Sequence, residues 1–265
     1  MKKYLQLARI TFQEYFVYRL NFILWRLRSL VQILALFFFW LAIFKLGGEF
    51  LSYGKEEMLT YLVGIVFLKS FVLASRTANL AGRIKSGSLT KELIRPWGIF
   101  KSFFTCDLVD KALNLVFAVA EIGLIFYYFK FTFFFPKSFW NIVAFLVVIL
   151  ISVFLYFFIS LWISTFSFWT DQPWAARWLF GVIFLDFLAG AYFPLDILPP
   201  VFGKIASLTP FPYLIYFPIK IWLEQITGIQ LVKPILISLL WLIAFWFILK
   251  KTWEKGLRNY AAYDG

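Results

Sequence analysis

The sequence predicts an all-α polytopic membrane protein in which six transmembrane helices form one domain over residues 1–265. Hydrophobic residues make up 62% of the chain and charged residues 15%, whereas soluble domains are roughly half apolar and about a quarter charged. The apolar residues form runs close to the length of about 20 residues that a helix needs to cross a bilayer. No polar segment is long enough to fold as a soluble domain.

Residues 1–28 are predicted to form an interfacial helix that lies in the headgroup plane. Their polar residues fall on one helical face and their apolar residues on another, as in amphipathic surface helices. The fourth of the predicted spans is longer than a bilayer requires, so we expect it to be tilted or to protrude. The six predicted spans cover residues 29–46, 57–76, 109–130, 139–167, 174–192 and 233–251.

Segment 193–232 is apolar enough to enter a membrane, but prolines interrupt it repeatedly. A continuous helix with so many prolines would leave backbone groups unpaired in hydrocarbon. We therefore expect short re-entrant or interfacial helices on the outer side instead of a seventh span.

The distribution of basic residues supports six spans, because Lys and Arg beside spans favour the cytoplasmic side. With this count, most basic residues lie on the side that holds both termini, and a seventh span would move the basic tail to the outside. The chain is thus expected to be a multi-pass protein of the cell (inner) membrane with both termini in the cytoplasm. The basic residues left on the outer side are Lys45, Lys55, Lys130, Lys137, Lys204, Lys220 and Lys233.

Segment 76–101 is a basic island between the second and third spans. Its charge alone is that of a loop that fixes the orientation of two spans. Ser88 or Thr90, followed by Glu92, also predicts a short capped helix, which Pro96 would end. An ordered cytoplasmic helix here is suited to transmit a push from a partner protein into both spans. Only Glu92 opposes the basic residues of the island, which are Arg76, Arg83, Lys85, Lys91, Arg95 and Lys101.

Ionisable residues inside spans are costly, which makes them candidates for function. Lys69 and Glu121 lie in the second and third spans, and we expect them to form a structural ion pair. Asp186 in the fifth span has no obvious partner, so it either lines a polar path or pairs with a second protomer. Ser160 and Ser164 belong to a hydroxyl stripe on the fourth span, which either packs helices closely or wets a pathway.

The chain has no His and a single Cys, Cys106. This composition excludes a disulfide within the chain, His/Cys zinc sites, and Ser-His or Cys-His catalysis. The nearest lookalike of a phosphate-binding loop, at residues 48–55, has the wrong spacing and lacks the hydroxyl residue. We expect no cofactor or metal on this chain, so that any ATP must be bound by another one. Lipid headgroups and topology explain the net charge of +12 better than nucleic acid does.

Three stretches and the basic N-terminal helix give the chain its resemblance to a known family. The stretches are GRIKSGSLTKELIRPWGIF after the second span, AYFPLDILPPVFGKIASLTPFPYLIYFPIKIWLEQITG after the fifth, and the ending WEKGLRNYAAYDG. They resemble permease subunits of ABC type-2 exporters, close to the daunorubicin-resistance-like permeases of bacteria. The resemblance implies an outer gate that includes Pro194, Leu195, Leu198 and Pro199. It also implies an ATPase-coupling stretch made of Gly82, Arg83, Lys85, Gly87, Leu89, Leu93, Arg95 and Pro96.

The resemblance further implies that two permeases, identical or different, pair with two separately encoded ABC ATPase subunits, which bind ATP and magnesium. It does not imply one substrate, since relatives handle drugs, lipids, glycans and peptides. The residues alone also allow an ion-gradient-driven secondary transporter with Asp186, Glu121 and Lys69 as coupling groups. A lipid-modifying enzyme has the least support, because no nucleophile–base pair stands out. A structural scaffold would need none of the intramembrane charges.

Overall fold

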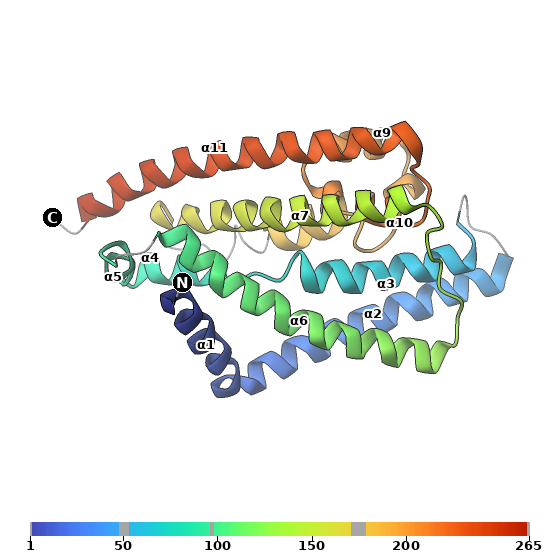
Figure 1. The fold of residues 1–265 in the computed structure, drawn as a ribbon, viewed down its shortest axis with the longest axis horizontal. Coiled ribbons are helices and arrows are strands. Elements are labelled where there is room, and N and C mark those ends of the chain that lie inside the picture. The colour runs from blue at the N-terminus through green and yellow to red at the C-terminus, as the bar shows by residue number, and fades with distance from the viewer. Residues whose placement is uncertain (1, 48–52, 96–97, 171–178, 264–265) are drawn as a thin grey trace.

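The computed structural model describes residues 2–47, 53–95, 98–170 and 179–263 of the chain. Its described residues form helices and contain no β-strand, which confirms the predicted all-α class. Five long helices lie roughly along the long axis of the molecule (Figure 1). They are α2 (Arg19–Gly47), α3 (Lys55–Phe71), α6 (Ile99–Phe129), α7 (Phe139–Thr165) and α11 (Val232–Tyr263).

Four of these helices, α2, α6, α7 and α11, are long and apolar enough to cross a membrane. The predicted count of six spans goes beyond this finding. Helix α3 has 17 residues, about 26 Å at the rise of an α-helix, against a hydrocarbon core of about 30 Å. The predicted fifth span begins outside the described residues, and of its described residues, 179–192, Leu179–Phe187 form a π-helix. The second and fifth spans therefore stay predictions.

Helices α2, α6 and α11 extend beyond the predicted spans, whereas α3 ends at Phe71 instead of 76. Helix α6 begins at Ile99 instead of 109, and α11 continues to Tyr263 instead of ending at 251. With 31 residues, α6 is about 46 Å long, which is more than the hydrocarbon core requires. The predicted spans are bounded by the ends of apolar runs. Polar turns that carry a helix beyond the hydrocarbon core lie outside such runs, so they are missed.

The predicted interfacial helix over residues 1–28 is too long. Helix α1 (Lys2–Val17) ends before a turn at Tyr18, and residues 19–28 belong to α2. The longer α2 tolerates Arg26 because the guanidinium forms an ion pair with Glu121 inside the bundle. Helix α1 lies at a steep angle to the bundle in Figure 1.

The two ends of the bundle differ in what covers them. Helices α4 (Ala78–Lys85) and α5 (Leu89–Leu93) lie at the end toward which both termini point (Figure 1). Short helices of segment 193–232 cover the other end, and prolines stand at or beside the start of several of them, where a missing N–H costs little. They are η3 (Leu195–Ile197), α9 (Pro200–Ser207), η4 (Phe211–Tyr213), α10 (Tyr216–Trp222) and η5 (Gly228–Leu231).

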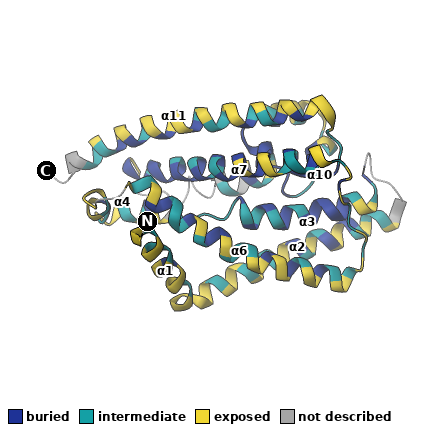
Figure 2. Ribbon diagram, in the orientation of Figure 1, coloured by how far each residue is buried: buried dark blue, intermediate teal, exposed yellow. Residues whose placement is uncertain are grey.

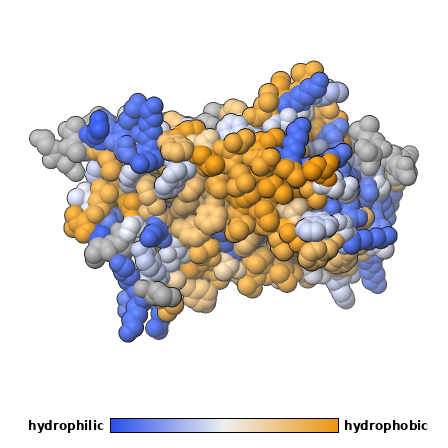
Figure 3. Space-filling view, turned by 45° about the horizontal axis from the view of Figure 1, so that its top comes forward, coloured by the Kyte–Doolittle hydropathy of each residue, from blue (hydrophilic) through white to orange (hydrophobic). Residues whose placement is uncertain are grey.

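Helices α3 and α7 contain more buried residues than the other long helices, while α2 and α11 expose one side along their length (Figure 2). Figure 3 shows hydrophobic side chains over the middle of the molecule and hydrophilic ones at both ends. This distribution fits a bundle whose middle faces lipid. Because α3 is enclosed by protein, its side chains cover less lipid-facing surface than those of the four longer helices.

A second apolar cluster lies at the end that holds α4 and α5. Leu80 and Ile84 of α4 pack there with Phe103 of α6 and Trp253 of α11. The 3₁₀-helix η1 (Phe166–Phe168), which follows α7, contributes Phe168. This cluster, called the end cluster below, joins the basic island to three long helices.

Replacing Gly256 of α11 by Ala should destabilise the end cluster. An added Cβ would overlap the ring of Phe168, and such overpacking typically costs about 1–3 kcal/mol. Thermal unfolding in detergent micelles should show a lower midpoint. Gly123→Ala in α6 is the matched control, since a Cβ at Gly123 meets no atom within 4 Å. Equal midpoints for the two variants would contradict the packing described here.

Candidate functional site

A non-helical linker, residues 72–77, connects α3 to α4, and α6 holds it from one side. Asp107 and Lys111 of α6 lie one helical turn apart, with exposed fractions of 0% and 1%, and their Oδ2 and Nζ atoms are 3.2 Å apart. Lys111 Nζ donates to the carbonyl oxygens of Val72 and Ala74, and Asp107 Oδ1 accepts from the backbone N–H of Arg76 at 3.2 Å. Lys111 thus satisfies the carbonyl of Val72, the C-cap of α3, which a helix end leaves without a partner, and the carbonyl of Ala74 beyond it.

Helix α7 holds the same linker from the other side. The Ser160 hydroxyl forms a short hydrogen bond with the Thr77 hydroxyl. Ser164 Oγ donates to the Thr77 carbonyl oxygen at 3.0 Å. We call Asp107, Lys111, Ser160 and Ser164, together with the linker, the linker clamp.

These contacts favour the packing interpretation of the serine stripe. Ser160 and Ser164 are 5% and 2% exposed, and their hydroxyls bond within the chain. The two hydroxyls therefore contribute to the packing of α7 against the linker, and their place on a translocation path stays a prediction.

Helix α1 contacts the linker as well. Arg76 NH1 lies 2.8 Å from Glu14 Oε2, and its guanidinium stands over the ring of Tyr15, 4.6 Å from the centroid. Because Glu14 is about half exposed, solvent screening makes this a weak tie compared with the buried clamp.

The basic island forms two helices where the sequence predicts one. Helix α4 was not predicted, and α5 begins at Leu89 after a turn at Gly87, whose positive φ of 69° favours glycine. Ser88 does not cap α5. Its hydroxyl instead bonds with the Ser86 hydroxyl at 2.8 Å. The predicted end of the helix at Pro96 lies outside the described residues.

The predicted coupling residues divide into an outward and an inward group. Leu89 is fully buried in the end cluster. Arg83 is part-exposed and pairs with Glu92 at 3.3 Å, which also binds Arg95 at 2.9 Å. The exposed members are Gly82, Lys85, Gly87, Leu93 and Arg95.

The C-terminal turns of α11 support this end of the molecule. Asn259 Nδ2 donates to the carbonyl oxygen of Phe168 at 2.7 Å, and the hydroxyls of Tyr260 and Thr90 are 3.2 Å apart. These contacts brace η1 and α5 against α11. Polar residues at a chain end gave no sequence signal for this role.

The predicted ion pair between Lys69 and Glu121 is wrong. Glu121 pairs with Arg26 of α2, and Lys69 pairs with Asp186, with Nζ and Oδ1 2.7 Å apart. The sequence prediction places Arg26 in the interfacial helix, which leaves it out as a partner for Glu121. Asp186 consequently has a partner within this chain and accepts a hydrogen bond from Tyr192 as well.

The predicted gate residues lie at the opposite end from the island. Pro194 and Leu195 are buried, Leu198 lines a cavity of about 400 Å³, and Pro199 is exposed. Beside them, Asp196 accepts hydrogen bonds from Tyr53 at 3.1 Å and from Lys220 at 2.6 Å.

Two tyrosines near Asp196 act as hydrogen-bond donors. Burial, assisted by the Asp196 carboxylate, raises the pKa of Tyr53 and of Tyr216 above the ordinary value for tyrosine. Both hydroxyls therefore keep their protons. The described part of the chain holds no group of three or more His, Cys, Asp or Glu that could bind a metal ion.

Comparison with known proteins identifies the kind of membrane protein to which this geometry belongs. A family model described as "ABC-2 family transporter protein" matches residues 30–263. The match includes the whole linker clamp, the basic island and segment 193–232. Among curated proteins, no match is found.

Replacing Lys111 by Met should destabilise the fold strongly. The change leaves Asp107 as a buried charge without its cation, and breaking a buried pair in this way costs about 3–5 kcal/mol. The thermal unfolding midpoint of the purified chain should fall accordingly. Lys137→Met is the control, because Lys137 is exposed. A midpoint for Lys111→Met equal to that of Lys137→Met would show that the clamp contributes nothing to stability.

Proposed function

We propose that this chain, which belongs to the ABC-2 transporter family, is the membrane-spanning permease subunit of an ATP-driven exporter. Two permeases, identical or different, form the translocation path, and two separate ABC ATPase subunits bind ATP and magnesium. The protein lies in the cell (inner) membrane with both termini and the basic island in the cytoplasm. The family supports the transport role and an ATPase partner, and the further assignments are ours.

The linker clamp is the observation that best supports coupling to an ATPase. Helices α4 and α5 present exposed residues at one end of the bundle, and the linker behind them is bonded to α6 and α7. Sliding the linker would leave buried polar groups unsatisfied, at a cost of about 1–3 kcal/mol each. A displacement of α4 therefore moves α6 and α7 with it instead of being absorbed in the linker.

The exposed surface of the island has the chemistry of a docking site. Lys85 and Lys91 are exposed beside Leu93 and Ile94, whose exposed fractions are 41% and 79%. A partner that buries these side chains needs an apolar groove with acidic residues at its rim. The end cluster behind this surface keeps α4 and α5 from yielding when the partner presses on them.

The outer end holds the second part of the proposed mechanism. The Asp196 carboxylate ties segment 193–232 to Tyr53, in the loop before α3, and Ser152 of α7 donates to the Tyr213 carbonyl oxygen at 2.7 Å. Motion of α3 and α7 thus reaches Pro194, Leu195, Leu198 and Pro199, the proposed gate. Asp186 lies in the fifth predicted span, where it pairs with Lys69.

The alternative is a secondary transporter driven by an ion gradient. The Lys69–Asp186 pair favours it, since two opposite charges lie within the predicted spans with side chains that are 28% and 18% exposed. Glu121 fits this alternative less well, because Arg26 already neutralises it.

Co-expression with an ABC ATPase encoded beside this chain tests the proposed function. The ATPase should co-purify with the wild type, and Lys85→Glu with Lys91→Glu should lower its binding about tenfold or more, because like charges at an interface cost several kcal/mol. Lys137→Glu, at the opposite end, is the control. If no ATPase binds, or if the double reversal binds as the wild type does, the proposed coupling is wrong.

Asp186→Asn distinguishes the two transport mechanisms. Removing the charge should leave ATP-dependent export by the assembled complex in place, since ATP hydrolysis and not a proton or sodium ion supplies the energy. A secondary transporter would lose gradient-driven transport in the same variant, with no ATPase present. Vesicles loaded with ATP or given an ion gradient measure the two activities separately.

A further inference from the structure

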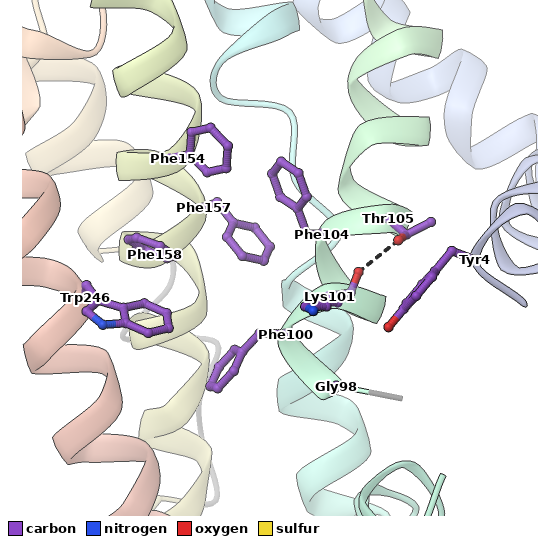
Figure 4. A pocket seen from close by; sticks show the side chains of 10 residues that line it. All are labelled: Tyr4, Gly98, Phe100, Lys101, Phe104, Thr105, Phe154, Phe157, Phe158 and Trp246. Atoms are coloured by element: carbon purple, nitrogen blue, oxygen red, sulfur yellow. Dashed lines mark hydrogen bonds between the residues drawn. The ribbon is translucent and has the colours of Figure 1, made fainter. Parts of the chain in front are cut away.

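An aromatic groove lies on the side of the bundle, toward the end that holds α4 and α5. Its cavity volume is about 510 Å³, within the range of about 300–1,000 Å³ that ligand pockets occupy. Figure 4 shows α6 on one side of the groove and α7 with α11 on the other. The rings that line it are Phe100, Phe104, Phe154, Phe157, Phe158 and Trp246.

The walls of the groove are held by contacts among these rings. Phe104 stacks on Phe154 with centroids 5.1 Å apart and meets Phe157 edge-on at 5.2 Å. Phe158 contacts Trp246 at 5.2 Å. Since the rings support one another across α6, α7 and α11, the groove exists before anything binds.

The mouth of the groove is cationic. Lys101, in the first turn of α6, lines the groove and is exposed. It forms no ion pair with any residue that the structure describes. Tyr4 of α1 lines the same mouth (Figure 4). Apolar walls with a single ammonium group at the opening match a ligand that is apolar along its length and anionic at its head.

We propose that this groove binds one acyl chain of an anionic membrane phospholipid, with the lipid phosphate paired to the ammonium of Lys101. The placement suits a lipid, because Lys101 stands at the helix end where headgroups lie, while the rings run toward the apolar middle of α7 and α11. The rings offer no partners to the backbone of a peptide or to a polar solute. A bound lipid would join α1, α6, α7 and α11 within one turn of Asp107, at the base of the linker clamp.

Native mass spectrometry of the purified full-length chain tests the proposal. The probes are phosphatidylglycerol and phosphatidylcholine with identical palmitoyl and oleoyl chains, titrated separately in detergent. One phosphatidylglycerol should bind more tightly than phosphatidylcholine. Lys101→Gln should weaken phosphatidylglycerol binding about fivefold, which is the effect of one basic residue near anionic lipid, and Lys101→Arg should restore it.

Two further variants keep the test independent of Lys101. Gly98→Leu should weaken the binding of both lipids, because the added side chain would occupy the mouth of the groove. Its Cβ would lie 3.8 Å from the aliphatic part of Lys101, so the replacement causes no clash there. Lys255→Gln is the matched control, because Lys255 is exposed at the same end and does not line the groove. Neither measurement needs the ATPase, so the outcome is separate from that of the proposed function.

Two results would overturn the proposal. Equal binding of the two lipids by the wild type, unchanged in Lys101→Gln, would show that only unselective annular lipid is present. A disulfide between two copies of a Cys106→Ser, Gly98→Cys chain would show that a second copy covers the groove.

Discussion

The buried Asp107–Lys111 pair fixes how α3 ends and how the chain leaves it. Two charges removed from water cost several kcal/mol each, and their attraction alone does not reliably repay that cost. In this chain the pair also binds two carbonyl oxygens and one N–H of the linker. Those backbone groups would otherwise be buried without partners. The pair and the non-helical linker therefore depend on each other. Without the linker the two charges would lack hydrogen-bond partners, and without the pair the buried backbone groups of the linker would lack theirs.

Several parts of the fold meet at that linker. Helix α7 forms hydrogen bonds to it through two buried hydroxyls, and α1 forms an ion pair with it through the more exposed Glu14. The end cluster packs α4 against α6, η1 and α11, so the island is fastened by polar bonds on one side and by apolar contacts on the other. Under the proposed function, a partner that presses on α4 and α5 would act on helices that are bonded to the bundle, as a permease driven by a separate ATPase requires.

The sequence predicted those features of the fold that depend on the length of apolar runs and on the positions of prolines. The all-α class, the apolar helices and the interruption of segment 193–232 follow from these local features. It failed where partners had to be chosen in three dimensions, since Lys69, Arg26, Glu121 and Asp186 allow more than one pairing and spacing does not choose between them. Asp107 and Lys111 did carry a signal, the i, i+4 spacing of opposite charges, but they lie at the edge of the third predicted span, where charges are easily taken for headgroup contacts. A charge inside the bundle needs a partner of opposite sign, and the sequence shows that much. Which partner it meets depends on where each helix begins and ends, and hydropathy does not locate those ends.

The most direct test of the proposed coupling is the distance between spin labels at position 127, at the far end of α6, in the two permeases of the proposed complex. Tyr127 is exposed, and a Cys106→Ser background leaves the label site as the single cysteine. ATP binding should change this distance in the otherwise wild-type chain. In Lys111→Met complexes that still bind the ATPase, the distance should stay as it is without ATP. An equal change in both would contradict the central claim that the linker clamp transmits the motion.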